Sequence, residues 1–513
     1  MSFSFYPNHE HKCPNVRHCP HLGGAALGTL VLMANEQDLS RRAMYATIDD
    51  ERARNARLVA ENGRLQRELE QVKLELKLER QNKFATNQQR QDSGNGSETT
   101  TSTANAAALV PEKKKRGAPV GHPGWFRKTP TEYDWAIDVS APVRCPHCRG
   151  PVTAVDVAPV EHLQEDILDG RYRVVLYRHE AALCDDCGKF VQQPGDGELL
   201  HSRIGPHLRS TAIFLRNVIG ISYRKIPQAI EEMFGITFTP AALIGFETML
   251  AEKSKPVVDD IAKKLGSSDG AVHADETYWT LNGQRAYYWV HCDARFAHFQ
   301  FDTSRSGQVS RDVLGEHFTG TLVTDCYAGY EAHIAGAKQK CLAHLARTGR
   351  DWQKLTQDGS ADFAFFDSIR EFVRKACHFH RLRAKGQLDE SQQTGEKVWL
   401  RERLLQLTTQ VVNHEKAVTL QKRILRHQHE WLVFLDDPRV SPTNNLAERT
   451  LRPLVVLRKI TFGHRSEAGA VRMARLMTVA ETAKRNGHRP SDIDYRLFSR
   501  PPAQVLRKLY DSG

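Results

Sequence analysis

The chain has 513 residues, of which 40% are hydrophobic and 26% charged, and its formal net charge is +11 with a sequence pI of about 9.1. This length exceeds what one ordinary hydrophobic core needs, and the share of apolar and aromatic residues excludes a wholly disordered chain, so we expect several globular domains. The basic excess favours a polyanionic partner, because Lys and Arg that neutralise phosphates release counterions; composition alone does not separate DNA from RNA or from an anionic membrane.

The hydrophobic runs of the sequence do not predict a membrane protein. The longest run near the start, residues 25–34, is interrupted by glycines, is too short to span a bilayer and lacks the cleavage pattern of a signal peptide. We therefore expect a cytoplasmic protein with no membrane partner. Ten cysteines are present, and in a reducing compartment the two CxxC pairs among them indicate metal binding and not a disulfide framework.

Residues 1–45 are rich in His and Cys. Cys13, His18, Cys19 and His21 could bind a metal ion, but their spacing matches no standard knuckle, and the role of this segment stays open. Residues 46–82 follow with a heptad pattern whose two seam positions hold Asn55, Asn62, Leu69 and Leu76 and, on the other position, Leu58, Leu65 and Val72. This pattern predicts a coiled coil, and hence a homodimer or higher oligomer; the alternative is a single charged helix.

Residues 83–130 have the composition of a disordered linker, rich in Gln, Ser, Thr, Asn and Gly. The linker contains a basic run followed by closely spaced glycines and prolines: Lys113, Lys114, Lys115 and Arg116. Such a run does not pack as a helix or strand, but it can lie along a DNA backbone or serve as a solvated tether, and both interpretations can hold.

Two CxxC pairs within residues 131–198 form the first strong motif. Cys145-Pro-His-Cys148 and Cys184-Asp-Asp-Cys187 supply four thiolates, the tetrahedral set that Zn²⁺ prefers, and Gly150 and Gly188 stand where each knuckle must turn. Residues 172–177, between the pairs, alternate partly as a strand does, so we predict a zinc ribbon with structural Zn²⁺. Redox activity is the alternative, but a thioredoxin-type pair needs no second CxxC.

Residues 199–256 are predicted to be helical. Three segments, 208–218, 223–234 and 239–250, are separated by breaks at Gly220 and near Gly235. Short helices joined by a turn suit a helix-turn-helix, with the segment from residue 239 as the candidate recognition helix. That segment carries few basic residues, so a plain packing bundle is the alternative.

Residues 257–490 predict a catalytic core of the ribonuclease-H type. Three β-rich runs end at Asp275, Asp293 and Asp302, and Asn282-Gly283 before the second run predicts a hairpin turn. A helix follows over 309–318, and a fourth strand ends at Asp325. In that arrangement the first and fourth strands can lie side by side, so Asp275 and Asp325 could meet. The fold class expected for the whole chain is multidomain α+β, with a ribonuclease-H-like α/β catalytic core.

Asp275 and Asp325 would need a cation between them, because adjacent carboxylates repel each other. Mg²⁺ (or Mn²⁺) suits oxygen ligands and phosphate substrates, and a two-ion site would assist in-line phosphoryl transfer. The best third carboxylate is Glu448, which shares one helical face with Asn444 and Arg452.

Residues 449–490 form the most basic part of the chain, with ten Lys or Arg against two acids. A positive surface beside a metal site suits a DNA backbone. The candidate DNA-binding residues here are Asn444, Arg449, Arg452, Arg458, Lys459 and Arg465. His273, like Asn444 and Arg452, could support the metal ligands or contact phosphate. The 122 residues between Asp325 and Glu448 predict a helical insertion at about 348–436, and residues 491–513 a C-terminal tail.

These motifs resemble the large transposase protein of the insertion-sequence sixty-six family. The matching segments are Lys114-Lys-Arg116 with Gly121-His-Pro-Gly-Trp125, both CxxC pairs, His273-Ala-Asp275-Glu-Thr277, Thr324-Asp325 with Tyr327 and Tyr330, Cys341-Leu-Ala-His344-Leu-Ala-Arg347, and Asn444-Asn445-Leu-Ala-Glu448-Arg449 with Arg452, Arg458-Lys459 and Gly463. Together they cover about residues 50–485, and the block at 444–463 is the most specific. The His/Cys-rich start and the residues after Arg347 depart from the family pattern, but neither touches the triad.

The resemblance implies a leucine zipper, a zinc ribbon, a helix-turn-helix region and a DDE catalytic core with a helical insertion, and it carries the triad onto Asp275, Asp325 and Glu448. It further implies a bacterial, nucleoid-associated enzyme that cuts the terminal inverted repeats of its own element and joins them to target double-stranded DNA. Small accessory proteins encoded beside it are expected partners. Two alternatives remain: a nuclease of the same fold that does not join, and a catalytically inactive zinc-ribbon DNA-binding regulator. For Cys341 and His344, packing is favoured over metal binding because no further ligand lies nearby in sequence.

Overall fold

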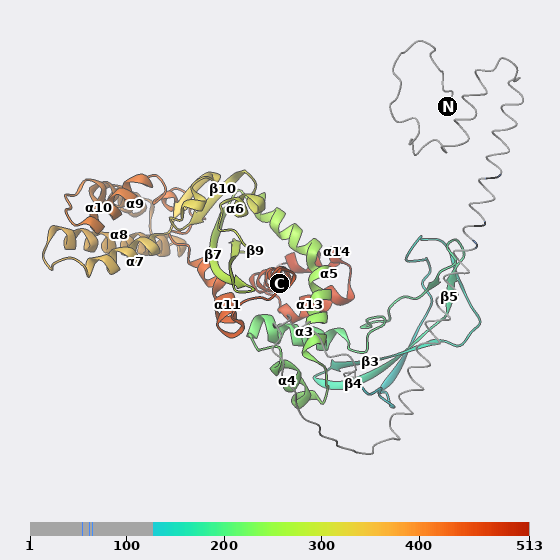
Figure 1. Cartoon of the computed structure of the whole chain (residues 1–513). Helices are drawn as coiled ribbons and strands as arrows, with labels where there is room; N and C mark the ends of the chain where they lie inside the picture. The colour runs from blue at the N-terminus through green and yellow to red at the C-terminus, as the bar shows by residue number, and fades with distance from the viewer. Residues whose placement is uncertain (1–53, 55–60, 62–63, 65–126, 512–513) are drawn as a thin grey trace, which may run out of the picture. The chain divides into compact units, whose positions relative to one another are not determined.

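The computed structural model describes Arg54, Glu61, Arg64 and residues 127–511 (Figure 1). The predicted His/Cys-rich segment, the basic run at 113–116 and nearly all of the predicted coiled coil lie outside these residues; the three described residues of the coiled coil are helical and exposed. From residue 127 onward the chain separates into two compact units. Unit 1 comprises Ala141–Val157 and Ala181–Gln192, and unit 2 comprises the rest.

Unit 1 is a small β-rich unit built around the two CxxC pairs. Its antiparallel sheet has the order β2 (Val152–Ala154), β5 (Ala182–Cys184) and β6 (Phe190–Val191). Its hydrophobic core consists of the buried residues Cys145, Ala182, Cys184 and Val191. So few apolar residues cannot stabilise a fold by burial alone, and a unit of this size needs another source of stability.

Unit 2 begins with a three-stranded sheet in the order β1 (Trp135–Val139), β4 (Arg171–His179) and β3 (Val160–Leu168). The strand predicted at 172–177 lies within β4. It pairs with β1 and β3 and does not join the sheet of the CxxC pairs, so the predicted ribbon is corrected in this respect. Four consecutive residues of β4, Val174 to Tyr177, are buried in unit 2, which explains why the strand belongs there.

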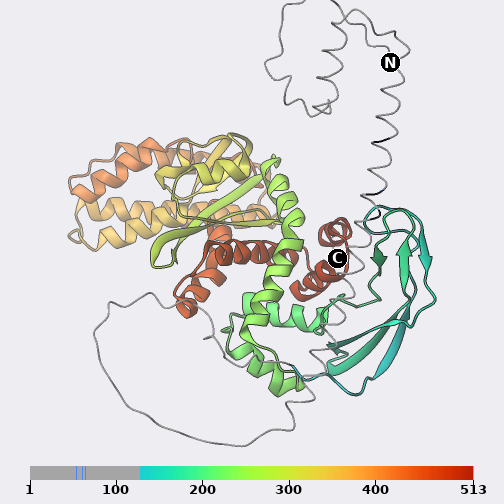
Figure 2. The same cartoon turned by 45° about the vertical axis from the view of Figure 1, so that its right-hand side comes forward.

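The three predicted helical segments are present, and the third is longer than expected. Helix α3 (Pro206–Phe214) continues into a π-helical turn and ends at Gly220, and α4 (Lys225–Phe234) ends at Gly235. Helix α5 (Pro240–Gly266) is the long green helix in Figure 2. It is not ended by Pro256, because its apolar stripe continues to Leu265. The exposed residues in its first turns include no Lys or Arg, which favours packing over the predicted recognition helix.

The central sheet of unit 2 has five strands in the order β11-β10-β7-β8-β9. Strands β7, β8 and β9 form an antiparallel meander, and β10 and β11 are parallel to β7. The strands are β7 (Ala271–Leu281), β8 (Gln284–Cys292), β9 (Ala297–Asp302), β10 (His317–Thr324) and β11 (Ile334–Lys340), with α6 (Gln308–Leu314) between β9 and β10. Asn282 and Gly283, both with positive φ, make the two-residue turn predicted between β7 and β8. The predicted adjacency of the first and fourth strands is confirmed.

Helices cover both faces of this sheet. On one face, Val272 and Ala274 of β7 pack in a core shared with α5 and α6. On the other face, Trp279 of β7 packs in a core shared with α11 (Asn445–Thr461) and α12 (Glu467–Arg485). The chain ends with α13 (Pro490–Ser499) and α14 (Pro502–Tyr510). Alternate residues of β7 therefore face different helices.

The predicted insertion between Asp325 and Glu448 is helical. Its helices surround a core that includes Phe365, Leu404, Leu420 and Trp431. They are α7 (Leu342–Gln353), α8 (Ala361–Ala384), α9 (Glu390–Thr409) and α10 (Glu415–Arg426), coloured yellow to orange in Figure 1. The mixed helices and sheets of the described chain are those of a multidomain α+β protein.

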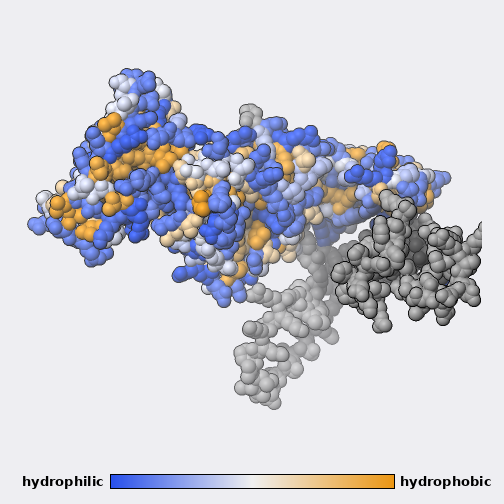
Figure 3. All heavy atoms as spheres, turned by 90° about the horizontal axis from the view of Figure 1, so that it is seen from above, coloured by the Kyte–Doolittle hydropathy of each residue, from blue (hydrophilic) through white to orange (hydrophobic). Residues whose placement is uncertain are grey.

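On the face shown in Figure 3, hydrophilic residues predominate and hydrophobic residues form separate patches. None of the helices in the described part of the chain is long and apolar enough to cross a membrane.

Candidate active site and metal-binding clusters

The register of two parallel strands brings Asp275 and Asp325 side by side. Strand β10 pairs with β7 up to Val323 opposite His273, and two further residues along each chain lead to Asp325 and Asp275. Asp325 follows β10 directly, as predicted, and its Oδ1 accepts a hydrogen bond from the Tyr327 N–H at 2.9 Å. Asp275 does not end its strand as predicted, because β7 continues to Leu281 as the partner of β8. It lies two residues beyond the point where the pairing with β10 stops.

Burial and like charge act together on Asp275. Burial is the main cause that raises the pKa of Asp275 to about 8, and the charges of Glu276, Asp325 and Glu448 raise it further. Asp325 and Glu448 thus lie near enough for their charges to act on Asp275. A cation held between them would remove this repulsion.

Glu448 lies in the first turn of α11 and faces α7. Its Oε1 is 3.5 Å from His344 Nε2, and its Oε2 is 3.8 Å from Arg347 Nη2. Glu448, His344 and Cys341 form a group whose ligand atoms all lie within 4.8 Å of one another; in the described chain, the trio Asp275, Asp325 and Glu448 is not such a group. The aspartates are therefore brought together, and the glutamate is held on the neighbouring helix.

Asn444 fixes the start of α11 against β7 and α7. Its Nδ2 donates to the Ala274 carbonyl at 2.8 Å, its Oδ1 lies 3.0 Å from His273 Nδ1, and its backbone N–H donates to Cys341 Sγ at 3.0 Å. Asn444 is fully buried, so we assign it to positioning the helix and not to the DNA contact expected from the sequence. Burial lowers the pKa of His273 to about 4, so this histidine is neutral at pH 7 and serves as a hydrogen-bonding partner of Asn444.

Glu276 is a buried carboxylate that sequence reasoning missed. It follows Asp275 on β7 and therefore points to the opposite face, where it accepts hydrogen bonds from Tyr330 Oη at 2.7 Å and Arg305 Nη2 at 2.6 Å. Burial raises the pKa of Glu276, and the charge of Asp325 raises it further. The alternation of β7 could have shown that Asp275 and Glu276 have different surroundings, but nothing in the sequence identifies Arg305 as the partner.

The predicted DNA-binding residues differ in how freely they present charge. Arg449, Arg452, Lys459 and Arg465 are exposed, whereas Arg458 is partly buried and donates to the Tyr278 carbonyl and, at 3.2 Å, to Thr277 Oγ1. Elsewhere in the basic stretch, three arginines are committed to partners within unit 2: Arg472 to Glu247, Arg475 to Glu252 and Arg485 to Thr450. The positive charge free for a partner is therefore concentrated on α11 and the loop after it.

A cavity of about 830 Å³ lies beside the start of β7 and α11. His273 and Arg449 line it, together with arginines from three other parts of unit 2: Arg295, Arg381 and Arg439. Arg439 is paired with Asp437 and Asp269, whereas Arg295 donates to the neutral oxygens of Asn486 and Tyr510. The lining includes Asp293 but none of Asp275, Asp325 and Glu448, and its arginines suit a phosphate-bearing ligand.

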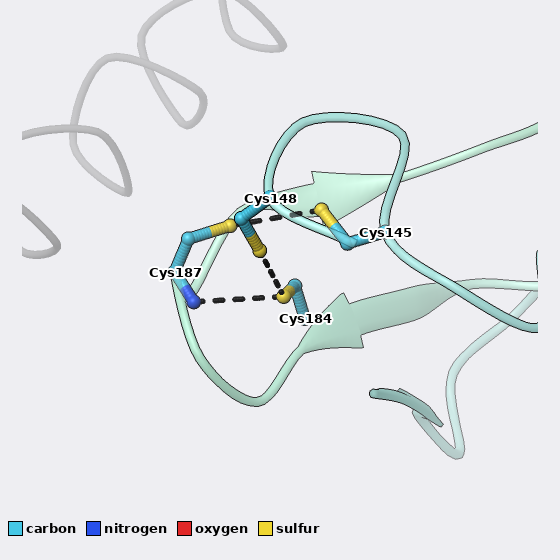
Figure 4. Close-up of side chains that lie close together, drawn as sticks. All are labelled: Cys145, Cys148, Cys184 and Cys187. Atoms are coloured by element: carbon cyan, nitrogen blue, oxygen red, sulfur yellow. Dashed lines mark hydrogen bonds between the residues drawn. The ribbon is translucent and has the colours of Figure 1, made fainter. Parts of the chain in front are cut away.

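The four cysteines of unit 1 form a closed cluster (Figure 4). Sγ of Cys145 lies 3.7 Å from Sγ of Cys187, and Sγ of Cys148 lies 3.4 Å from Sγ of Cys184. Hydrogen bonds from backbone N–H groups reach three of the sulfurs, as at His147 N to Cys145 Sγ at 3.4 Å. The donors fit a tetrahedral Zn²⁺ ion, which these N–H groups would help to hold by stabilising thiolates.

The two knuckles turn by different means. In the second, Gly188 adopts a positive φ of 62°, as the sequence predicted. In the first, Arg149 takes the positive φ of 67°, and Gly150 is needed for another reason: a Cβ there would lie 2.1 Å from Asp186 Oδ2. The glycine of the first knuckle thus permits close packing and does not make the turn.

The comparisons with known proteins agree with the motifs. The sequence model described as "Transposase IS66 family" matches residues 201–472, more than half of the chain. The uncharacterized protein y4hP of Sinorhizobium fredii is 25% identical over 434 residues, which cover 75% of this chain and 75% of that protein. The uncharacterized protein y4qI of the same organism is 25% identical over 324 residues, covering 56% of this chain and 54% of that protein.

Proposed function

The chain belongs to the transposase IS66 family, and from this premise we propose that it is a DDE transposase that cleaves the terminal inverted repeats of an insertion sequence and joins them to target DNA. Asp275, Asp325 and Glu448 are its catalytic carboxylates. The observation that carries the proposal is the parallel register of β10 and β7, which leads Asp325 to the side of Asp275.

The catalytic domain in this proposal is a ribonuclease-H-like core that spans residues 257–490. The meander β7-β8-β9, the helix α6 and the parallel strand β10 support this fold, because they carry the two aspartates on adjacent strands. The helices α7 to α10 are the insertion of that core. Their positions between Asp325 and Glu448 let them control where Glu448 points.

Asp275, Asp325 and Glu448 would hold Mg²⁺ or Mn²⁺, because three carboxylates offer the oxygen donors that these ions prefer. The ion would supply electrostatic stabilisation of the phosphoryl oxygens during transfer. Other residues of the chain position this site and bind the DNA. Asn444 holds the start of α11, His273 supports Asn444 as a neutral hydrogen-bonding partner, and the exposed arginines bind the DNA backbone.

The four cysteines would hold a structural Zn²⁺ ion in unit 1. With Cys145, Cys148, Cys184 and Cys187 as ligands, no position is left open for a substrate, so this ion would stabilise the fold and take no part in catalysis. We propose that unit 1 is the zinc ribbon of a DNA-binding region.

The DNA-binding surface proposed here consists of Arg449, Arg452, Lys459 and Arg465, with Arg458 as a residue that links α11 to β7. Replacement of Arg452 by Ala should reduce the dependence of DNA affinity on salt, by about one unit of the logarithmic slope. Arg475→Ala is the matched control, because Arg475 is paired with Glu252.

The basic run Lys113, Lys114, Lys115 and Arg116 would add contacts to the DNA backbone. A coiled coil at 46–82 would make the protein a homodimer or higher oligomer, with accessory proteins of the same element as further partners.

The test is cleavage and joining of a labelled duplex that carries the end of the element, in Mg²⁺ or Mn²⁺. Wild type should yield joined product, and Asp325→Ala should yield neither cleaved nor joined product. Asp302→Asn is a control, because Asp302 ends β9 of the same sheet and its Oδ1 caps a turn by accepting from Ser304 N at 2.7 Å. Cleavage that persists in Asp325→Ala would refute the site. Cleavage without joining would favour the nuclease, and specific binding without cleavage in either metal would favour the regulator.

A further inference from the structure

Glu448 completes a second group of metal-ligating side chains. Its Oε1 lies 3.5 Å from His344 Nε2, and one ligand atom from each of Glu448, His344 and Cys341 lies within 4.8 Å of the others. In the sequence no third ligand lies near Cys341 and His344, so the sequence alone predicts that both residues pack and bind no metal. The fold supplies the third ligand from α11, far along the chain.

The spacing of these atoms is typical of ligands around an ion. Among the described residues, Glu448 Oε1 is buried without a hydrogen-bond partner, and its 3.5 Å from His344 is close to the roughly 3.4 Å that separates ligands of a tetrahedral zinc ion. A second His/Glu group provides a contrast. There His162 Nδ1 and His179 Nε2 lie 2.5 and 2.9 Å from Glu198 Oε1, at hydrogen-bonding distances, so that group is satisfied without an ion.

The donor set determines which ion would bind. A thiol sulfur, an imidazole nitrogen and one carboxylate oxygen suit Zn²⁺ and not Mg²⁺, which prefers oxygen ligands only. Cys341 is the N-cap residue of α7, and its Sγ accepts the backbone N–H of Asn444 at 3.0 Å. Contacts of the same N–H to sulfur kind occur in the four-cysteine cluster, and they stabilise a thiolate.

We propose that Cys341, His344 and Glu448 form a Zn²⁺ site that competes with the catalytic use of Glu448. Zinc binding releases the Cys341 thiol proton to solvent, and the thiolate and carboxylate charges balance the ion, with water in the fourth position. The competition rests on the proposed function, in which Glu448 joins Asp275 and Asp325. With Oε2 already 3.8 Å from Arg347, zinc would hold the carboxylate on the α7 side.

Binding is tested on the full chain by metal content and by Co²⁺ titration. Wild type should hold about two zinc ions per chain, one at the four cysteines and one here, and Cys341→Ala should hold about one. Co²⁺ at the site should give a thiolate charge-transfer band that Cys341→Ala lacks. Cys377→Ala is the matched control, because Cys377 is another free cysteine of unit 2 and should leave both readouts unchanged. If Cys341→Ala does not fold, His344→Ala tests the same count at a partly exposed residue.

Equal zinc content in folded wild type and folded ligand variants would overturn the site. Competition is tested by adding Zn²⁺ to Mg²⁺-dependent cleavage. Zinc should inhibit wild type, and His344→Ala should need at least about tenfold more zinc for the same inhibition. Inhibition that is equal in both proteins would overturn the competition. If wild type never cleaves DNA while the zinc content depends on Cys341, the proposed function fails and the zinc site stands.

Discussion

The four cysteines of unit 1 and the three carboxylates of unit 2 are both clusters of acidic side chains. Only the cysteines lie close enough to one another to share an ion. The cysteine sulfurs approach to 3.4 and 3.7 Å across the two knuckles, whereas the trio Asp275, Asp325 and Glu448 does not come within 4.8 Å in the described chain. A protonated thiol is neutral and packs as a small apolar group, but a carboxylate at neutral pH is charged and strongly hydrated. Thiols can therefore approach before a metal ion binds, and carboxylates approach at a cost.

This difference separates a site that serves folding from one that serves chemistry. A closed thiolate site stabilises its unit, because the free energy of metal binding is also free energy of folding. An open carboxylate site leaves positions for water and for the phosphate of a substrate. The raised pKa of Asp275 is the mark of the second kind, since the fold keeps this carboxyl buried beside other acids.

The largest effect should come from removing one charge of the open site. Asp275→Asn should lower the rate of strand cleavage by at least about a thousandfold, because the metal ligands supply several kcal/mol of transition-state stabilisation. Glu276→Gln is the comparison variant, because Glu276 is the next residue and is bonded to Arg305 and Tyr330, while its charge raises the pKa of Asp275. It should lower the melting temperature and leave cleavage within about tenfold of wild type. Single-turnover cleavage and thermal unfolding give the two values, and an equal loss of cleavage in both variants would contradict the assignment.

A substitution in the four-cysteine site should affect folding and not catalysis. Cys184→Ser should release zinc and unfold unit 1, because Cys184 is buried in its small core and is one of four ligands. Hydrogen exchange, read peptide by peptide, should lose protection at 141–157 and 181–192 and keep it in the central sheet of unit 2. Protection that falls equally in the central sheet would show that the two units do not fold separately.

The sequence predicts a structural feature correctly where that feature requires a particular residue type at a particular position. The CxxC spacing predicted the four-cysteine cluster, and Asn282 with Gly283 predicted the turn between β7 and β8. Strand order was predictable because two apolar runs each lead to an aspartate. Residue pairs far apart in the chain were not predictable. Neither the bond of Asn444 to Ala274 nor the approach of Glu448 to His344 leaves a periodic pattern, since each arises from how α11 packs.

A smaller effect should separate turn formation from packing in the first knuckle. Gly150→Ala places a Cβ 2.1 Å from Asp186 Oδ2, so Asp186 must move and the zinc affinity of unit 1 should fall. Overpacking of this kind costs typically about 1–3 kcal/mol, or roughly tenfold to a hundredfold in affinity. Competition with a chelating dye measures the loss. The double variant Gly150→Ala with Asp186→Ala should recover most of it, and no recovery would mean that the glycine is needed for its backbone conformation.

A further effect should appear in the pH dependence of stability without magnesium. Asp275 titrates near 3.8 in the unfolded chain and at about 8 in the folded protein, so between these values the folded protein binds the extra proton. The free energy of unfolding therefore falls as pH rises from about 4 to about 8. Over this range Asp275 loses its proton in the unfolded chain and keeps it in the folded protein. In Asp275→Asn this contribution is absent, and the melting temperature should depend less on pH over that range. Added Mg²⁺ should raise the melting temperature of wild type most near pH 8, where metal no longer competes with the proton. Melting curves of the two proteins that stay parallel across this range would show that burial does not hold the proton on Asp275, and the contrast with the neutral thiols of unit 1 would then lose its electrostatic basis.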